Sequence, residues 1–316
     1  MPTVISTFAG CGGSSLGYKL AGFKELLAVE WEQNAVDTFH LNFPEVPVYH
    51  GDIAKLTGNE CMKLAGIEKG MLDVLDGSPP CQGFSTAGKR RFDDPRNSLF
   101  REYARLLSEL QPKVFVMENV TGMIKGCMKQ AYLQIIKTLR ECGYKAKGEV
   151  MNAMYFNVPQ SRERVIIIGV REDLGIEPSH PKPQGKPITV RKALEGCIDT
   201  GKALTPEAAK YFDRMKPGET ASKYHPKGHL FGLVKLHPDY PSPTLTRTAG
   251  ASKPVHWEEK RFIGIKERAR FASFPDSFQW SGKWTDIYNL QGNSVPPNLM
   301  KAIAEHIKVN ILEARA

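Results

Sequence analysis

The first candidate for chemistry is a single cysteine in a loop with two prolines. Residues 71–76 predict a short buried strand, and Cys81 follows it in the stretch Gly77-Ser78-Pro79-Pro80-Cys81. In an open α/β sheet, ligands bind at the carboxyl ends of the strands, so the Cys81 thiol is placed where it could act as a nucleophile. Lys89 and Arg90, in the glycine-containing segment that follows, would suit a polyanionic substrate. A buried, inert cysteine is the alternative, and a lone cysteine does not decide between the two.

A carboxylate and two arginines form the second candidate group. The apolar run at residues 114–117 is typical of a central parallel strand, and it would deliver Glu118 to the same edge as Cys81. A carboxylate at the end of a buried strand is costly unless it has a partner or a chemical role. Arg162 and Arg164 are two residues apart, so they would share one face of an extended chain. They could clamp a phosphate while one guanidinium braces Glu118, or they could be two surface arginines.

A glycine-rich turn near the N-terminus predicts a ligand that contains ribose. Residues 4–8 predict a strand, and Gly10 lies in the turn after it. Glu30 ends a second predicted strand, 20 residues after Gly10, the spacing at which an acid accepts hydrogen bonds from ribose hydroxyls. The third glycine of the dinucleotide pattern is replaced by Ser15, and no phosphate-binding lysine follows. A ligand with ribose and no pyrophosphate, such as S-adenosylmethionine, fits better, with Trp31 as a face for adenine.

A third strand, at residues 46–49, leads to Asp52 and Ile53. Asp52 could accept a hydrogen bond from an adenine amino group while Ile53 packs on the ring. It could equally cap the next helix. Strands and helices alternate in this way up to about residue 172, which predicts an α/β fold with a mostly parallel sheet.

The charge of the chain is concentrated in one segment. The 316 residues carry a net charge of +9, and residues 173–283 hold 19 basic and 12 acidic side chains, a net +7. The same segment holds 12 of the 22 prolines. Its stretches 223–229 and 242–250 mix hydrogen-bond donors, glycines and aromatic residues, as base-reading loops do. A nucleic-acid-facing module is therefore favoured over a merely solvated basic surface.

The six cysteines are scattered, without a C-x-x-C pair. This pattern argues against a zinc site or a disulfide framework and for a reducing cytoplasm, so no metal is expected. No apolar stretch approaches the length of a membrane span, and the N-terminus runs into the first strand without a signal peptide.

In order along the chain, these pieces closely resemble the cytosine-5 DNA methyltransferases of restriction-modification type. The resemblance covers nearly the whole chain, and its most specific part is the Cys81 loop combined with the Glu118 motif. Two positions depart from the family pattern, with Gly264 where threonine is usual and Lys266 where arginine is common. The matching segments are Phe8-Ala9-Gly10-Cys11-Gly12-Gly13, Glu30-Trp31, Gly51-Asp52-Ile53, Pro79-Pro80-Cys81-Gln82-Gly83-Phe84-Ser85, Glu118-Asn119-Val120, Gln160-Ser161-Arg162-Glu163-Arg164, Arg261 through Pro275, and Gly292-Asn293-Ser294-Val295-Pro296.

The resemblance implies a covalent mechanism. The Cys81 thiolate would attack carbon 6 of cytosine and so make carbon 5 nucleophilic. Glu118 would hydrogen-bond nitrogen 3 and supply a proton, while Arg164, and with it Arg162, would orient the base and balance charge. The methyl group would pass from S-adenosylmethionine to carbon 5, leaving S-adenosylhomocysteine, and loss of the carbon-5 proton would expel Cys81. A base inside a duplex is out of reach, so the target cytosine would be flipped out.

The resemblance also implies the architecture and the binding residues. We expect a Rossmann-like S-adenosylmethionine-dependent methyltransferase sheet and a smaller, irregular target-recognition domain. The charge and proline split places the catalytic domain at 1–172 plus 284–316 and the recognition domain at 173–283. The cofactor would contact Phe8, Gly10, Cys11, Gly12, Glu30, Trp31, Asp52, Ile53, Pro80, Leu99, Asn293 and Val295. The DNA would contact Ser85, Lys89, Arg90, Arg96, Thr244 and Arg247.

The expected partner is double-stranded DNA, bound by a monomer, with a cognate restriction endonuclease that need not bind the protein. The expected location is the cytoplasm of a prokaryotic or phage-infected cell, associated with the nucleoid when DNA is bound.

Three alternatives carry different functions. A tRNA cytosine methyltransferase of the same family would be expected to have Phe-Thr where this chain has Phe84-Ser85. A non-catalytic relative that binds DNA or S-adenosylmethionine would have no need for both Cys81 and Glu118. A dinucleotide-dependent oxidoreductase is disfavoured by Ser15 at the position of the third glycine.

Overall fold

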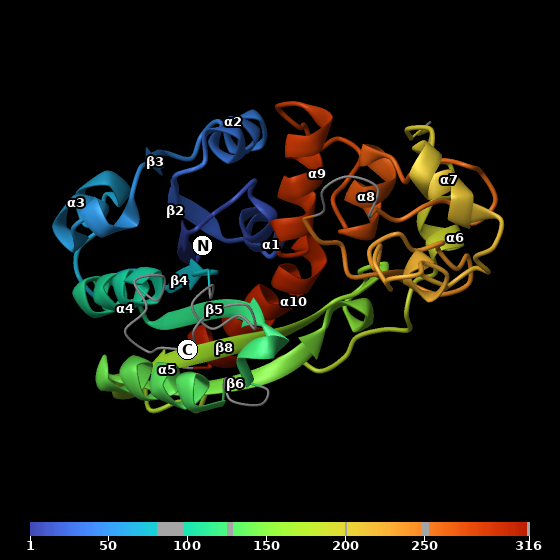
Figure 1. Ribbon diagram of the computed structural model, residues 1–316. Coiled ribbons are helices and arrows are strands. Elements are labelled where there is room, and N and C mark those ends of the chain that lie inside the picture. The colour runs from blue at the N-terminus through green and yellow to red at the C-terminus, as the bar shows by residue number, and fades with distance from the viewer. Residues whose placement is uncertain (81–97, 125–128, 200, 248–252, 315–316) are drawn as a thin grey trace. The chain divides into compact units, whose positions relative to one another are not determined.

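The computed structural model describes residues 1–80, 98–124, 129–199, 201–247 and 253–314 (Figure 1). The chain divides into two compact units. The first consists of Met1–Asn152, Glu163–Lys182 and Leu299–Ala316, and the second of Ala153–Arg162 and Pro183–Asn298. Residues 153–162 and 284–298 thus fall in the second unit, whereas the sequence-based limits assign them to the catalytic domain. The sequence-based limits define domains by function, which a division into compact units does not test, so they stay a prediction.

A seven-stranded sheet forms the centre of the first unit, in the order β3-β2-β1-β4-β5-β8-β6 (Figure 1). Strands β1 to β5 pair with one another in parallel, and β8 runs antiparallel between β5 and β6. The order reverses between β1 and β4, the switch point where doubly wound sheets bind ligands. The predicted α/β fold is confirmed. The strands are β1 (Thr3–Thr7), β2 (Lys24–Glu30), β3 (Val48–His50), β4 (Val74–Gly77), β5 (Val114–Val120), β6 (Tyr144–Asn152) and β8 (Glu163–Arg171).

Helices α4 and α5 supply much of the apolar core of this unit. Ile5, Leu75 and Phe115 of the central strands share a buried cluster with Tyr103 of α4 and Leu139 of α5. Within the described residues, no helix is both long and apolar enough to cross a membrane. The helices are α1 (Gly13–Leu20), α2 (Gln33–Asn42), α3 (Gly58–Ala65), α4 (Ser98–Leu110), α5 (Lys129–Glu141) and α10 (Pro297–Ile307), with 3-10 turns at 53–55, 121–124 and 172–174 and a π-helical turn at 308–312.

Strand β4 ends at a glycine that has no room for a side chain. A Cβ at Gly77 would overlap the Thr7 hydroxyl of β1 and lie 2.7 Å from the Tyr103 ring of α4. The Tyr103 hydroxyl donates to the carbonyls of Leu75 and Val116, at 3.2 and 3.1 Å. Strands β1, β4 and β5 are therefore held tightly together at the point where the chain leaves β4 toward Cys81.

The second unit is built from short elements and long irregular segments. Strands β7 (Gln160–Ser161) and β9 (Ser242–Pro243) form a two-residue parallel ladder. The regular helices are α6 (Val190–Ala193), α7 (Pro206–Phe212), α8 (Ile265–Phe271) and α9 (Trp284–Asn293), with 3-10 turns at 153–155 and 221–223. A separate buried cluster contains Ala208, Phe212, Met215, Ala221, Leu233, Val255 and Phe262.

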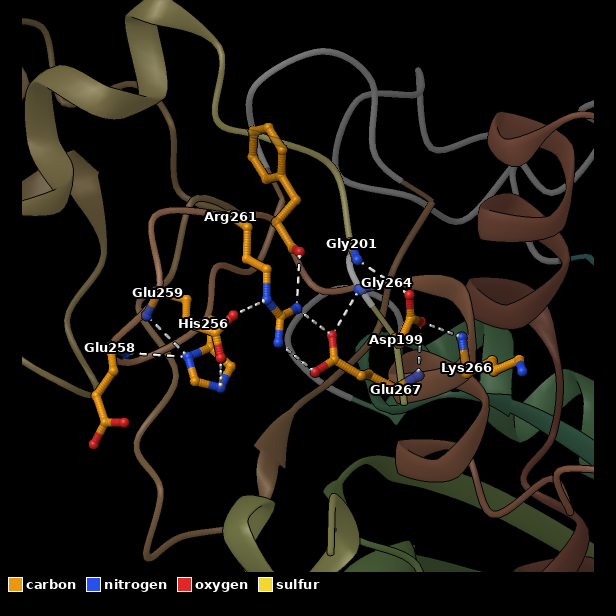
Figure 2. A network of polar contacts seen from close by, with 10 residues as sticks. Asp199, Gly201, His256, Glu258, Glu259, Arg261, Gly264, Lys266 and Glu267 are labelled. Carbon is orange, nitrogen blue, oxygen red and sulfur yellow. Dashed lines mark hydrogen bonds and ion pairs between the residues drawn. The ribbon is translucent and has the colours of Figure 1, made fainter. Parts of the chain in front are cut away.

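A polar network surrounds the start of α8 (Figure 2). The Arg261 guanidinium makes two hydrogen bonds to the Glu267 carboxylate, at 2.7 and 2.9 Å, and its Nε donates to Glu259 at 2.7 Å. Glu267 also accepts from the Gly264 amide at 2.8 Å. Arg261 and Glu267 are 12% and 4% exposed in their side chains, so this bidentate pair is well shielded from water and fixes the entry of the chain into α8.

The N-cap of α8 is supplied from a distant part of the chain. The N-cap residue is Gly264, which has no side chain to cap the helix. Instead, Asp199 accepts hydrogen bonds from the amides of Lys266 and Glu267, at 2.8 and 3.4 Å (Figure 2). A Cβ at Gly264 would overlap this carboxylate. Asp199 therefore supplies the cap that Gly264 cannot provide, and it fills the space that a side chain at position 264 would need.

This arrangement predicts that positions 199 and 264 are coupled. Asp199→Ala should cost about 1 kcal/mol of helix stability because two first-turn amides lose their acceptor. Gly264→Thr should destabilise the wild-type chain by overlap, yet restore stability in the Asp199→Ala background, since Gly264 has φ −79° and ψ 175°, which threonine adopts easily. Hydrogen exchange of the α8 amides in all four proteins would measure the coupling. Equal damage from Gly264→Thr in both backgrounds would rule out Asp199 as the cap.

Candidate active site and cofactor site

An ion pair lies at the carboxyl end of β5. Glu118 Oε1 is 2.8 Å from Arg164 Nε, and the two side chains are only 10% and 13% exposed. Glu118 stands on β5 opposite Ile166, and Arg164 stands on β8 opposite Val120, so the two side chains meet across one strand pairing. The sequence-based expectation that one guanidinium braces Glu118 is met by Arg164. The carboxylate gains a charged partner while it stays at the edge of the sheet.

Arg162 has different surroundings, in the second unit. Its side chain is buried, and its Nη1 donates to the carbonyls of Leu245 and Gly292, at 2.9 and 3.1 Å. These contacts join three segments of the second unit that are far apart in the sequence. Although Arg162 and Arg164 are two residues apart, the structure gives them different partners.

Asn119 ties the end of β5 to the segment that leads to Cys81. Its Nδ2 donates to the Pro79 carbonyl at 2.9 Å, and its Oδ1 accepts from the Val120 amide at 2.9 Å. Sequence reasoning quoted Asn119 only as part of a motif and missed this role. The signal was a short amide side chain directly after the acid at a strand end. Cys81 itself lies outside the described residues, as do Ser85, Lys89, Arg90 and Arg96.

The glycine turn after β1 has the backbone conformation that its sequence suggests. Gly10 and Gly12 have positive φ, at 56° and 91°. A Cβ at Gly12 would lie 2.5 Å from the Phe43 ring, whereas the space beside Gly10 is open. Gly12 is therefore required by packing, and Gly10 leaves the backbone accessible. Phe8 also has positive φ and packs against the core, and Cys11 is buried.

Glu30 is held at this turn by three backbone amides. One carboxylate oxygen accepts from Gly10 at 2.7 Å, and the other accepts from Trp31 and Glu32, at 2.8 and 2.9 Å. The carboxylate is thus fixed beside the turn, and the oxygen that accepts from Gly10 has a further lone pair. The Trp31 side chain is 70% exposed. These residues fit a ligand with ribose hydroxyls and a flat base, and residues 9–13 include no cation for a pyrophosphate.

Asp52 caps the short helical turn that follows it, with Oδ1 accepting from the Ala54 amide at 3.0 Å. The capping interpretation of Asp52 is therefore confirmed, while contact with adenine stays a prediction. Ile53 is buried in the core, and Leu99 packs against the same cluster. Pro80 is exposed at the end of the described segment after β4.

The remaining candidate residues lie in the second unit. Asn293 is exposed at the end of α9, and Val295 is buried. Thr244 donates its hydroxyl to the Ser161 carbonyl at 2.8 Å, so it supports the β7–β9 pairing. Arg247 is exposed, and its contact with DNA stays a prediction.

Sequence reasoning missed two acids that accept hydrogen bonds from α1, Asp76 and Glu25. Asp76 of β4 is 3% exposed, and the Tyr18 hydroxyl donates to it at 3.4 Å. Burial raises the pKa of Asp76 from its ordinary 3.8 to about 8, and the nearby charges of Glu25 and Glu118 add to the rise. Burial likewise raises the pKa of Glu25 to about 7. Sequence periodicity could not predict the burial of Asp76, because an aspartate in a four-residue strand could equally well be exposed.

Comparison with solved structures places the fold of the chain among methyltransferases. A putative DNA modification methyltransferase encoded within an Escherichia coli prophage has the same fold, with a TM-score of 0.83 and 25% identity over 99% of this chain and 100% of that one. The Dnmt2 methyltransferase of S. pombe, with a TM-score of 0.71 and 19% identity over all of both chains, agrees in fold.

Sequence comparison defines the family. The family model for C-5 cytosine-specific DNA methylase matches residues 2–309. The type II methyltransferase M1.HphI of Haemophilus parahaemolyticus is 36% identical over 98% of this chain and 88% of its own length. M.Eco47II of Escherichia coli is 34% identical over 98% of this chain and 79% of its own length. The chain therefore belongs to the C-5 cytosine-specific DNA methylase family, and the resemblance seen in the motifs is confirmed.

The buried Asp76 predicts a pH dependence of stability. Because its pKa is raised on folding, the folded state holds the proton more tightly, and stability should fall as pH rises from about 4 to about 8. The neutral variant Asp76→Asn lacks this term, so its melting temperature should exceed that of the wild type by a margin that widens with pH over this range. Thermal unfolding at several pH values would measure the margin. A margin that narrows toward pH 8 would mean that Asp76 is buried as a stabilised carboxylate.

Proposed function

We propose that this enzyme methylates carbon 5 of a flipped cytosine within a specific duplex sequence, through a covalent bond from Cys81. The observation that carries the proposal is the Glu118–Arg164 ion pair at the edge of the sheet, 2.8 Å between Nε and Oε1. Gly77, the last residue of β4, pairs with Met117, the residue before Glu118. The segment that continues to Cys81 therefore starts beside the carboxylate, and Asn119 holds it there through Pro79.

The proposed roles divide one difficult substitution into two easier steps. The Cys81 thiolate adds to carbon 6, and Glu118 gives a proton to nitrogen 3 as the electron pair moves into the ring. Carbon 5 then takes the methyl group. Loss of the carbon-5 proton to solvent restores the double bond to carbon 6 and expels the thiolate, while nitrogen 3 returns its proton. Arg164 holds the Glu118 carboxylate in position and balances its charge in the step where it is ionised.

The proposed cofactor site is the edge formed by the turns after β1, β2 and β3. S-adenosylmethionine supplies, when bound, an electrophilic methyl group on a positively charged sulfur. The Glu30 carboxylate would accept hydrogen bonds from ribose hydroxyls, and the exposed Trp31 side chain would cover the adenine. The other proposed contacts are Phe8, Gly10, Cys11, Gly12, Asp52, Ile53, Pro80, Leu99, Asn293 and Val295.

The proposed substrate is double-stranded DNA, bound by one copy of the chain. Arg162 would act on the target base indirectly, by ordering the segment at Leu245 and α9. Arg247 and the basic side chains after Cys81 would contact DNA. The protein would act in the cytoplasm of a prokaryotic or phage-infected cell, on nucleoid DNA, and could serve beside a restriction endonuclease without binding it.

Expression in a host that lacks 5-methylcytosine, followed by bisulfite sequencing, tests this function directly. The wild type should methylate one cytosine in a recurring short sequence on duplex DNA. Cys81→Ser should produce no methylation, because a serine hydroxyl is far less ionised at neutral pH and is a poorer nucleophile. Methylation of tRNA in place of genomic DNA would contradict the proposed substrate.

Once that experiment has given the target DNA sequence, a modified duplex of the same sequence can identify the nucleophile. A duplex with 5-fluorocytosine at the target has no proton to lose at carbon 5, so elimination should stall with the protein attached. The expected product is a denaturant-resistant adduct whose crosslinked peptide contains Cys81. An adduct through Cys11, Cys61 or Cys127 would refute the assignment.

Glu118→Gln should slow methyl transfer by roughly 10²–10⁴-fold, the scale of lost general acid catalysis. Glutamine can still hydrogen-bond nitrogen 3, yet it cannot readily give up a proton. Glu163→Gln is the matched control, because Glu163 is exposed at the start of β8, and it should leave the rate within about twofold. Single-turnover rates at saturating DNA would measure both. A Glu118→Gln rate equal to that of the control would remove Glu118 from the chemistry.

A further inference from the structure

Five residues of the second unit form a basic–aromatic cluster around α9: Lys202, Lys253, Arg268, Trp284 and Tyr288. Trp284 and Tyr288 are one helical turn apart and stack, with ring centroids 4.7 Å apart and an angle of 26°. Cations are gathered around these two rings. Lys202 Nζ and Lys253 Nζ lie 4.7 and 4.3 Å from the Trp284 centroid, and the Arg268 guanidinium carbon lies 3.4 Å from the Tyr288 centroid.

The three cations have no carboxylate partner among the described residues. Other basic side chains of this unit are paired, such as Arg261 with Glu267 and Lys260 with Asp213. Arg268 is fully buried, and its Nη2 donates to the carbonyls of Thr246 and Tyr288. Burial lowers the pKa of Arg268 to about 10.

The charges of the cluster also repel one another. The pKa of Lys253 is lowered by burial and by the charges of Lys202 and Arg268. The cation–π contacts with Trp284 and Tyr288 offset part of this cost. A group of like charges that is held together on aromatic rings without counterions gains most from an external anion.

The cluster is continuous with a segment already implicated in DNA contact. Arg268 donates to the Thr246 carbonyl, and Gly292 of α9 lies so close to residues 246 and 247 that a Cβ there would be 2.6–2.8 Å from their backbone atoms. Arg247 is exposed next to this contact. Lys202 is exposed and Lys253 half-buried, so their amino groups are the accessible part of the cluster.

We propose that the basic–aromatic cluster binds the backbone phosphates of the DNA substrate, with Lys202 and Lys253 as the contacting side chains. This inference rests on the proposed function, in which duplex DNA is the substrate. Lysine on a ring face contacts a phosphate as a point charge and reads no base edge. The site therefore fixes the position of the duplex and leaves sequence recognition to other loops.

The test is the salt dependence of DNA affinity, measured without cofactor by fluorescence anisotropy. In Lys202→Met/Lys253→Met, the methionines keep the apolar contact with the rings and remove both charges. The slope of log affinity against log salt should fall by roughly one to two units, at about 0.9 per phosphate contact. DNA affinity should fall by the same factor for duplexes that contain the enzyme's target sequence and for unrelated duplexes.

Two further variants separate the cluster from general charge and from damage to the fold. Lys192→Met/Lys260→Met removes two charges from the same unit that are paired with Glu195 and Asp213, and it should leave the slope near the wild-type value. Lys202→Arg/Lys253→Arg keeps the charges and should restore the slope. Thermal unfolding of each variant checks the fold.

Three outcomes would overturn the inference. Equal slopes for the cluster variant and the paired-lysine control would show that the cluster contacts no phosphate. Loss of affinity for the methylated sequence alone would indicate base reading. An unchanged slope, together with loss of stabilisation by millimolar inorganic phosphate, would indicate a free-anion site. Because the readout is binding, a wild type that binds DNA without methylating it would refute only the proposed function.

Discussion

The antiparallel strand β8 is the constraint on which the rest of the candidate active site depends. In a purely parallel sheet, the strand beside β5 would bring its carboxyl end to the edge where Glu118 lies. Because β8 runs the other way, its first residues meet the end of β5, and Arg164 reaches Glu118 across a single strand pairing. A carboxylate at a partly buried sheet edge needs such a partner, and here the topology of the sheet provides it.

The tight packing around the β1–β4 switch point serves the same site. Gly77 has no space for a side chain. The Tyr103 hydroxyl donates hydrogen bonds to backbone carbonyls of β4 and β5, and the Asn119 side chain donates one to the carbonyl of Pro79. The chain therefore leaves β4 in a fixed direction. The buried acid Asp76, one residue earlier, adds a cost that these contacts must offset at neutral and alkaline pH.

Much of the first unit could be predicted from the sequence, because its strands are apolar runs and its candidate site residues follow them directly. The expected strands at 4–8 and 114–117 correspond to β1 and β5. Sequence periodicity could not show that Arg162 and Arg164 have different partners, since tertiary contacts determine those partners. Sequence periodicity could not predict the three amides that hold Glu30, the burial of Asp76 or the basic–aromatic cluster around Trp284, for the same reason.

The capping of α8 by Asp199 bears on how segments of the second unit can be exchanged between relatives. The acceptor and the helix start are 65 residues apart in the sequence, and each is shaped to the other. A graft that replaced the segment around Asp199 and kept Gly264 would leave the first turn of α8 without its acceptor. A chimera would have to carry both positions from one parent, so the smallest exchangeable module of this protein extends through α8.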